Sequence, residues 1–410
     1  MSVRLDLHPE SAPLPSAPRL WLWSGLLGVF LVLGAGALML FAPPTLRHHP
    51  LGFWGLGLGV PLLVWSVLGF TRALIFICQQ RAAQAWNQAR EESLNRKIRR
   101  GRRSQQVLST SLYSTHRVPG EQGSAQLQAL LSKTKALKAE PSEGGEATAR
   151  LSRFTNAQDK AHEHIVLVTL QEVLKDLGQT LEQVPAQTPL ALLLEVDSSV
   201  PDHVLSRVWR QAWLASGIRQ STVSVEGHGL AAVDNWLDQR INDQALLMVV
   251  ALQFAPQMPE ATAEVAVGLL FGNRLTQTTL APIAYLHRPE QARDRSSEQL
   301  LYAARQALDW VPLTAPSITQ VWQSGIDREH GAGLITLLHD LAMPVGANQG
   351  LINLDACLGH AGQASPWLAI AGATQTIELG AGPQFIFSGG GSAQTGLWST
   401  VLTPAAALST

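Results

Sequence analysis

Residue types that commonly carry chemistry are sparse in this chain of 410 residues. It has two cysteines, Cys78 and Cys357, and no Cys-x-x-Cys pair. His162 and His164 are separated by a single residue, which is not a spacing that puts two zinc ligands on one face of a helix, and no His-Glu-x-x-His motif occurs. We therefore predict no metal site and no bound cofactor. Two cysteines exclude a disulfide framework and fit a reducing compartment.

Three consecutive glycines, Gly389, Gly390 and Gly391, form the clearest small-residue cluster. Their backbone N–H groups could make a nest for an anion. A tight turn against closely packed backbone uses the same residues, and the pattern does not decide between the two.

Alternating helices and strands are expected to position these residues from about residue 155 onward. Strands are predicted at 190–196, 245–253, 264–271, 351–356, 384–387 and 397–402, and helices at 159–182, 204–216, 229–241, 296–308 and 359–378. Such alternation predicts an α/β domain with covered sheets. A duplication of one half of this domain is compatible with the pattern, although no repeat is visible as sequence identity.

Two long apolar stretches precede that domain. Residues 20–42 and 51–71 contain no charged side chain, and each is long enough to cross a hydrocarbon core of about 30 Å. The first is too long for the apolar core of a cleaved signal peptide, which is typically about 7–15 residues. We therefore predict a membrane hairpin over residues 20–78.

A basic segment follows the hairpin, although the chain as a whole is nearly neutral. The chain carries 30 basic and 31 acidic residues, which argues against nucleic acid as a partner. The local cluster comprises Arg96, Lys97, Arg99, Arg100, Arg102 and Arg103. By the positive-inside rule these flanking residues place both termini in the cytoplasm, so we expect a multi-pass protein of a bacterial inner membrane.

These features predict five segments. They are a cytoplasmic tail (1–19), the membrane hairpin (20–78), a basic helix (79–106), a linker with the first elements (107–154) and the α/β domain (155–410).

The C-terminal half resembles the thiolase-like fold of the β-ketoacyl-acyl carrier protein synthases. Residues 351–372 (LINLDACLGHAGQASPWLAIAG) are similar to that family's strand, Gly-His turn and small-residue helix, and 382–394 (GPQFIFSGGGSAQ) to its last strand and glycine-rich loop. Residues 227–236 (GHGLAAVDNW) resemble the start of its buried nucleophile helix. Residues 245–253 and 258–271 resemble the strands that follow. The resemblance implies two transmembrane helices followed by a thiolase-like α/β/α layered domain.

The sequence departs from that family at the nucleophile. The resemblance puts the family's reactive cysteine on or near Glu226, and no cysteine lies between Cys78 and Cys357. His360 matches one of the two family histidines and His330 is the candidate for the other. Glu226, His330 and His360 are therefore vestigial candidates, and no catalytic residue is assigned, because histidines without a nucleophile complete no acyl-transfer site.

Loss of the nucleophile in a membrane-attached chain indicates a binding role. Catalytically dead thiolase-like proteins that resemble this one are encoded beside type VI secretion effectors, so one reading is a membrane adaptor for such an effector or another soluble partner. The alternatives are an acyl-thioester-binding or cysteine-independent enzyme and a non-catalytic partner subunit of a ketosynthase. The resemblance also implies a homo- or heterodimer, and we expect its interface at an edge strand formed by residues 245–253.

Overall fold

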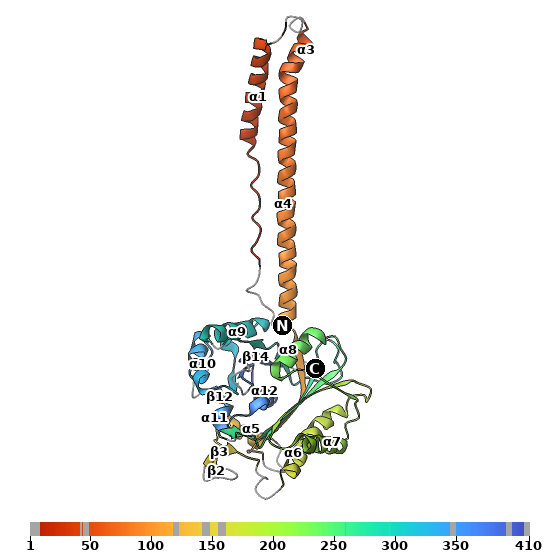
Figure 1. Cartoon of the computed structure of the whole chain (residues 1–410), viewed down its shortest axis with the longest axis vertical. Helices are drawn as coiled ribbons and strands as arrows, with labels where there is room; N and C mark the ends of the chain where they lie inside the picture. Colours follow the sequence, from red (N-terminus) through yellow and green to blue (C-terminus); the bar gives the residue numbers. More distant parts are fainter. Residues whose placement is uncertain are drawn as a thin grey trace. The chain divides into compact units, whose positions relative to one another are not determined.

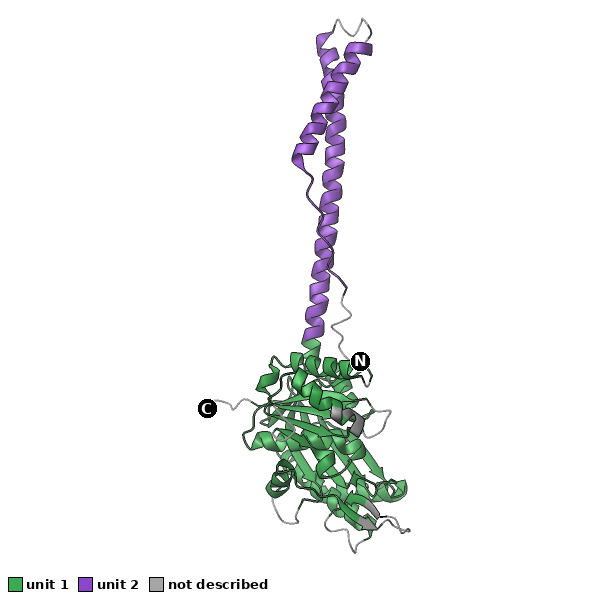
Figure 2. Ribbon diagram, turned by 90° about the vertical axis from the view of Figure 1, so that its left-hand side faces the viewer, with its two compact units in different colours: residues 1–3, 99–410 green, residues 4–98 purple. Residues whose placement is uncertain are grey.

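The computed structural model describes residues 9–41, 43, 49–117, 123–141, 148–154, 161–258, 260–294, 296–344, 350–390 and 396–405. Two compact units are present: a helical unit, residues 4–98, and a globular unit that begins at Arg99 (Figure 2).

The helical unit is an antiparallel hairpin. Helix α1 (Leu20–Phe41) is followed by α3 (Pro50–Trp54), the π-helix η1 (Gly55–Gly59) and α4 (Val60–Gly101), which continue one another. Both α1 and the continuous helix Pro50–Gly101 are long and apolar enough to cross a membrane. With 22 residues, α1 is about 33 Å long, close to the thickness of a hydrocarbon core.

Small residues bring the two helices together. A Cβ atom at Gly34 would lie 2.3 Å from Cγ of Pro61 and 2.5 Å from the carbonyl oxygen of Gly57. Only glycine permits this approach, as at many helix contacts in membranes. Nearby, Nε1 of Trp65 donates to the carbonyl oxygen of Trp23 at 2.9 Å.

The segment before α1 runs back along α4. The backbone N–H of Ala12 donates to Oδ1 of Asn87 at 2.9 Å, and Nδ2 of Asn87 donates to the carbonyl oxygen of Ala12 at 3.2 Å. Nε of Arg90 donates to the carbonyl oxygen of Pro9 at 2.7 Å. These contacts place residues 9–12 beside the part of α4 that lies beyond its apolar stretch.

The globular unit is built from two halves with the same order of elements. The first comprises β1 (Ser104–Tyr113), α6 (His162–Leu181), β4 (Leu190–Ser198), α7 (Asp202–Ser216), β5 (Thr222–Ser224), α8 (Gly229–Gln239), β6 (Leu246–Phe254) and β8 (Val265–Asn273). The second comprises β9 (Ala284–His287), α9 (Ser297–Trp310), β11 (Gln320–Ser324), α10 (Arg328–Asp340), β12 (Leu351–Asn353), α12 (Ser365–Glu378), β13 (Gln384–Ser388) and β14 (Trp398–Pro404).

Strand pairing repeats between the halves. The described strands run in the order β12-β11-β13-β14-β9-β1-β8-β6-β4-β5. In the first half β4 is parallel to β5 and β6, and β8 is antiparallel to β6 and β1. In the second half β11 is parallel to β12 and β13, and β14 is antiparallel to β13 and β9. The antiparallel pair β1–β9 joins the halves, so the duplication is visible in topology although not in sequence.

Three apolar clusters divide the unit into layers. One packs α6 and α7 against the first half-sheet, and a second packs α9 and α10 against the other. The third lies between the half-sheets and contains residues of α8 and of α12, and Figure 1 shows α12 near the centre of the globular unit. Because α12 contacts strands of both halves, the layers follow the order helix, sheet, helix, sheet, helix. This arrangement is the α/β layered fold predicted from the sequence.

Shorter elements complete the unit. They are α5 (Ser124–Leu131), β2 (Lys138–Pro141), β3 (Thr148–Ser152), β7 (Thr262–Ala263), β10 (Glu290–Gln291), α11 (Leu354–Cys357) and the 3-10 helices η2 (Ala315–Ser317) and η3 (Gly362–Ala364). Strands β2, β3 and β7 form a small separate sheet, and β10 pairs with β14.

The structure differs from the prediction at the start of the α/β domain and at the edge of its large sheet. Strand β1 lies in the middle of the large sheet, so the α/β domain includes residues 104–113 and does not begin at 155. Residues 138–141 and 148–152 are strands, not linker. Strand β6, which we expected at a sheet edge, pairs on both sides and is buried at every position. The edge strand of the first half is β5.

Candidate functional site

The first candidate site is the N-terminus of α8, where the resemblance placed a nucleophile. Glu226 lies in the exposed loop between β5 and α8. Gly227 and Gly229 have φ of +115° and +53°, a conformation that glycine allows and that turns the chain into the helix. His228 precedes the first helical residue, its side chain is 86% exposed, and it makes no side-chain cap.

A buried carboxylate occupies this helix end instead. The backbone N–H of Gly229 donates to Oε1 of Glu195 at 2.6 Å, and Nε1 of Trp367 on α12 donates to Oε2 at 2.5 Å. Glu195 is 4% exposed and comes from β4. The positive end of the helix dipole therefore already faces an internal anion. A thiolate or a tetrahedral oxyanion would have to compete with that carboxylate for the same N–H group.

His360 is built into a loop at the same end of the central layer. Its Nδ1 accepts from the backbone N–H of Gly362 at 3.0 Å. Its carbonyl oxygen accepts from Nε2 of the buried Gln253 at 2.7 Å and from the N–H of Ala263 at 3.0 Å. A Cβ at Gly362 would lie 1.9 Å from Oε1 of Gln253, so this loop depends on glycine. The described contacts of His360 thus hold the loop together.

The described hydrogen bonds do not link the other predicted residues to Glu195. The backbone of His330 lies in α10, and its side chain is outside what the structure describes. Gly389 and Gly390 follow β13, whereas Gly391 lies outside the described residues. No hydrogen bond or ion pair joins Glu226 to His360 in the described part of the chain. No group of three or more histidine, cysteine, aspartate or glutamate side chains there could hold a metal ion.

Cys357 is a free, buried residue of α11 and does not lie on α8. It belongs to the central apolar cluster and is 3% exposed. Burial raises the pKa of its thiol, which disfavours the thiolate that acyl transfer needs.

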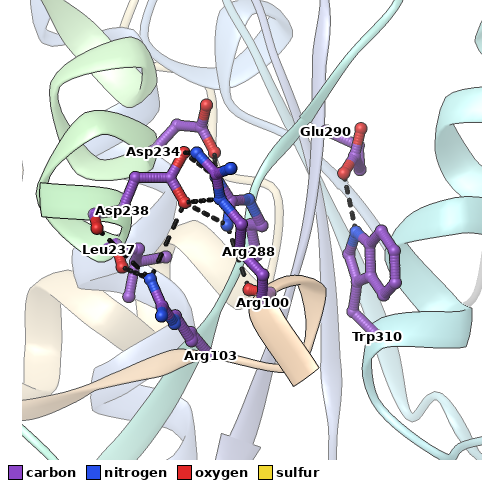
Figure 3. Close-up of polar contacts among 8 residues, drawn as sticks. All are labelled: Arg100, Arg103, Asp234, Leu237, Asp238, Arg288, Glu290 and Trp310. Carbon is purple, nitrogen blue, oxygen red and sulfur yellow. Dashed lines mark hydrogen bonds and ion pairs between the residues drawn. The ribbon is translucent and has the colours of Figure 1, made fainter. Parts of the chain in front are cut away.

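The second candidate site is a charge cluster around the buried Arg288, near the other end of α8, shown in Figure 3. We call it the arginine–aspartate cluster, and its members are Arg100, Arg103, Asp234, Asp238 and Arg288. Arg288 follows β9, and its side chain is 0% exposed. It lies 2.6 Å from Asp234 and 2.8 Å from Asp238, two carboxylates one turn apart on α8.

Two residues of the predicted membrane-flanking group belong to this cluster. Arg100, in the last turn of α4, makes two hydrogen bonds to the Asp238 carboxylate at 2.6 and 2.5 Å. Nη1 of Arg103 donates to the carbonyl oxygen of Leu237 at 2.8 Å, near the C-terminus of α8, where a cation is favoured by the helix dipole. Helix α8 is therefore held by an anion at its N-terminus and by a cation at its C-terminus.

The electrostatics of the cluster follow from burial and pairing. Burial opposes ionisation of Asp238, but hydrogen bonds from Arg100 and Arg288 outweigh it and lower the pKa of Asp238 to about 2. Glu290 of β10 lies close by, and burial raises the pKa of its carboxyl to about 7 although Nε1 of Trp310 donates to it at 2.6 Å.

Close packing fixes the end of α4 as well. A Cβ at Gly101 would lie 2.2 Å from Cζ3 of Trp310, so the indole ring rests directly on the helix backbone. Nη1 of Arg288 also donates to the carbonyl oxygen of Arg100 at 3.0 Å. Residues 99–103 are therefore an integral part of the globular unit.

Comparison with known proteins identifies the fold. No protein-family model and no curated protein matches this sequence. The chain is similar in structure to the ishigamide ketosynthase/chain length factor, with a TM-score of 0.53 and 14% identity over 73% of this chain and 99% of that one. It is also similar to a PfaC ketosynthase–chain length factor, with a TM-score of 0.52 and 11% identity over 74% of this chain.

A third similar structure is the AntDE:AntF complex, described as a type II polyketide synthase acyl carrier protein with its ketosynthase (TM-score 0.50, 11% identity, 74% of this chain and 100% of that one). This chain spans 43% of the length of the PfaC protein. At these identities the likeness concerns the fold alone. The globular unit has the thiolase-like fold that the sequence predicted.

Proposed function

We propose that this chain is a membrane-tethered, catalytically inactive thiolase-like adaptor that binds a soluble protein partner. The observation that carries the proposal is the Glu195 carboxylate at the N-terminus of α8. It accepts a hydrogen bond from the N–H group of Gly229, and the position that the resemblance assigns to the nucleophile is in the exposed loop that contains Glu226. Acyl transfer through a thiolate has neither its nucleophile nor a vacant helix terminus at this place.

The membrane location is supported by the helical unit. Residues 9–12 bind α4 between Asn87 and Arg90, so both ends of the hairpin lie beyond its apolar part on the same side. Arg96, Arg99 and Arg102 are exposed in this region and suit the cytoplasmic face. We infer a multi-pass protein of a bacterial inner membrane with both termini in the cytoplasm.

The partner surface is best assigned to the edge strand β5. All three of its residues are exposed, and Val223 is 59% exposed. Among the described strands only β4 pairs with it. The equivalent edge strand of the other half, β12, is buried at two of its three positions. An unprotected edge on one half of a duplicated fold favours pairing with a strand of another chain.

The partner is then a second thiolase-like chain or a soluble protein such as a secreted effector. A role as the non-catalytic partner subunit of a ketosynthase is the second candidate. It is supported by the ketosynthase/chain length factor proteins among the similar structures, which have the same fold.

The experiment compares complexes purified from native membranes through a tag on the full chain. Val223→Lys places a charge on the proposed edge, and Leu275→Lys is the matched control because Leu275 is 68% exposed in a turn after β8. We expect a partner in stoichiometric amount with the wild type and Leu275→Lys, and its loss with Val223→Lys. A wild-type chain that purifies alone as a monomer, or a Val223→Lys complex of unchanged composition, contradicts the proposal.

A further inference from the structure

A cavity of about 640 Å³ opens on the outer face of the first half-sheet, between α7 and β4. Its walls are leucines of α6, β4, α7 and β6 together with Trp209 and Trp213. The two indole rings are 5.7 Å apart on successive turns of α7. This volume lies within the range of about 300–1,000 Å³ that is typical of ligand sites.

The cavity is separate from the α8 site. Side chains alternate across a strand, and β4 directs Leu193 and Glu195 toward the central layer. Leu192 and Leu194 point the other way and line the cavity. The half-sheet therefore stands between this cavity and the N-terminus of α8.

The cavity exists because α7 packs mainly against α6, which lies beside it in Figure 1, and does not close over β4. Leu194 remains 38% exposed and Leu214, on α7, 77% exposed. Exposing apolar side chains in a concave wall is unfavourable in water, and an apolar ligand chain would cover them.

Helix α7 contributes several hydrogen-bond donors to the lining of the cavity. They are the guanidinium of Arg210, the hydroxyl of Ser206 and the indole N–H groups of Trp209 and Trp213. None of these donors has a hydrogen bond to another described residue. Arg207, one turn before Arg210 on the same helix, instead makes a bidentate pair with Glu163 at 2.8 Å. Arg210 is thus a cation with no anion of its own in the described chain.

The acidic group of the cavity, Asp202, lies one turn from Ser206 but far from Arg210. Asp202 is in the first turn of α7, and eight residues separate it from Arg210, about 12 Å along the helix. An anionic head group at Arg210 therefore avoids Asp202, while its chain extends along the leucines of β4.

We propose that this cavity binds a fatty-acid-like amphiphile, with the carboxylate on Arg210 and the tail between β4 and the indole wall of α7. Arginine binds carboxylates through two parallel hydrogen bonds, which suits a head group at the rim. The tail would contact Leu192 and Leu194 and cover Trp209 and Trp213. Thr222 of the adaptor strand β5 also lines the cavity, so the two sites adjoin, but the amphiphile proposal does not rest on the adaptor role.

The test uses the full chain in lipid nanodiscs and a hexadecanoic acid that carries a photoactivatable diazirine near the end of its tail. After irradiation, labelled peptides are mapped by mass spectrometry. Label on α1 and α4 from probe dissolved in the bilayer serves as the internal reference. We expect additional label on β4 and α7, and competition by unlabelled hexadecanoic acid.

Variants separate the tail site from the head site. Leu194→Trp or Leu214→Trp fills the cavity and should abolish label on β4 and α7, while Leu275→Trp should not. Arg210→Gln should weaken labelling by the acid about tenfold, because a charge-assisted hydrogen bond is lost. It should leave labelling by the methyl ester unchanged, and Arg305→Gln on α9 should change neither.

Three results would overturn the proposal. They are label confined to the membrane helices, label on β4 and α7 that survives both filling substitutions, and equal labelling of Arg210→Gln and wild type by the acid. The two filling variants are monitored by circular dichroism, and either one that folds is sufficient for the comparison.

Discussion

Replacing Arg288 by methionine should destabilise the globular unit strongly. Its guanidinium has no exposed surface and lies between the carboxylates of Asp234 and Asp238. Methionine fills a similar volume but leaves two buried anions facing each other. Removing one partner of a buried ion pair costs about 3–5 kcal/mol, because the remaining charge is neither solvated nor paired. Arg100 still binds Asp238, so we expect the lower part of this range.

Thermal unfolding of the full chain in nanodiscs measures this effect. A loss of about 3 kcal/mol lowers the midpoint of a domain of this size by about 5 °C. Arg305→Met is the matched control, because Arg305 is exposed on α9 and its replacement should change the free energy of unfolding by less than about 0.5 kcal/mol.

A second variant separates charge from packing. Adding Asp234→Asn and Asp238→Asn to Arg288→Met removes the uncompensated anions and should recover most of the lost stability. Equal midpoints for Arg288→Met and Arg305→Met would refute the reasoning, because the cluster would then contribute nothing. A triple variant as unstable as Arg288→Met would show that the loss comes from packing and not from unpaired charge.

Three further outcomes are expected. Gly101→Leu should cost about 1–3 kcal/mol in chemical denaturation because its side chain meets the Trp310 ring, whereas Gly333→Ala, with open space around it in α10, should be neutral or stabilising. Glu290 has a pKa of about 7 in the folded state and 4.5 normally, so its contribution to stability is complete below pH 4.5 and is lost as the pH rises through 7. The loss is about 3 kcal/mol in the free energy of unfolding measured against pH, and it should be absent in Glu290→Gln. Cys357→Ala should leave partner binding unchanged in the pull-down, and cysteine-directed ketosynthase inhibitors should not label the wild-type chain.

Elements with a strong local pattern were predictable from the sequence. Long uncharged stretches predicted the two candidate membrane spans, and continuous apolar runs predicted β4, β6 and β8. The predicted helix over 359–378 is shorter in the structure, because the chain first forms the Gly-His turn and η3, and Pro366 stands at the start of α12, where it needs no backbone N–H partner.

Features that depend on long-range pairing were not predictable. The buried position of β1 follows from strands more than a hundred residues away, so its polar sequence gave no sign of a central strand. Arg100 and Arg103 were interpreted as topology signals because a run of arginines does not reveal which of them meets Asp238. The role of Glu195 could have been predicted, because a carboxylate at an inward position of an apolar strand requires a buried hydrogen-bond donor.

The measurement that tests the central claim most directly is the intact mass of the full chain after incubation with acyl-coenzyme A and with acylated acyl carrier protein. Because Glu195 occupies the N-terminus of α8 and Cys357 is buried in α11, we predict no covalent acyl adduct on any residue. The partner should remain bound throughout the incubation. Stoichiometric acylation that is lost in Cys357→Ala, or that maps to the loop around Glu226, would contradict the account and identify the protein as an acyl-transfer enzyme.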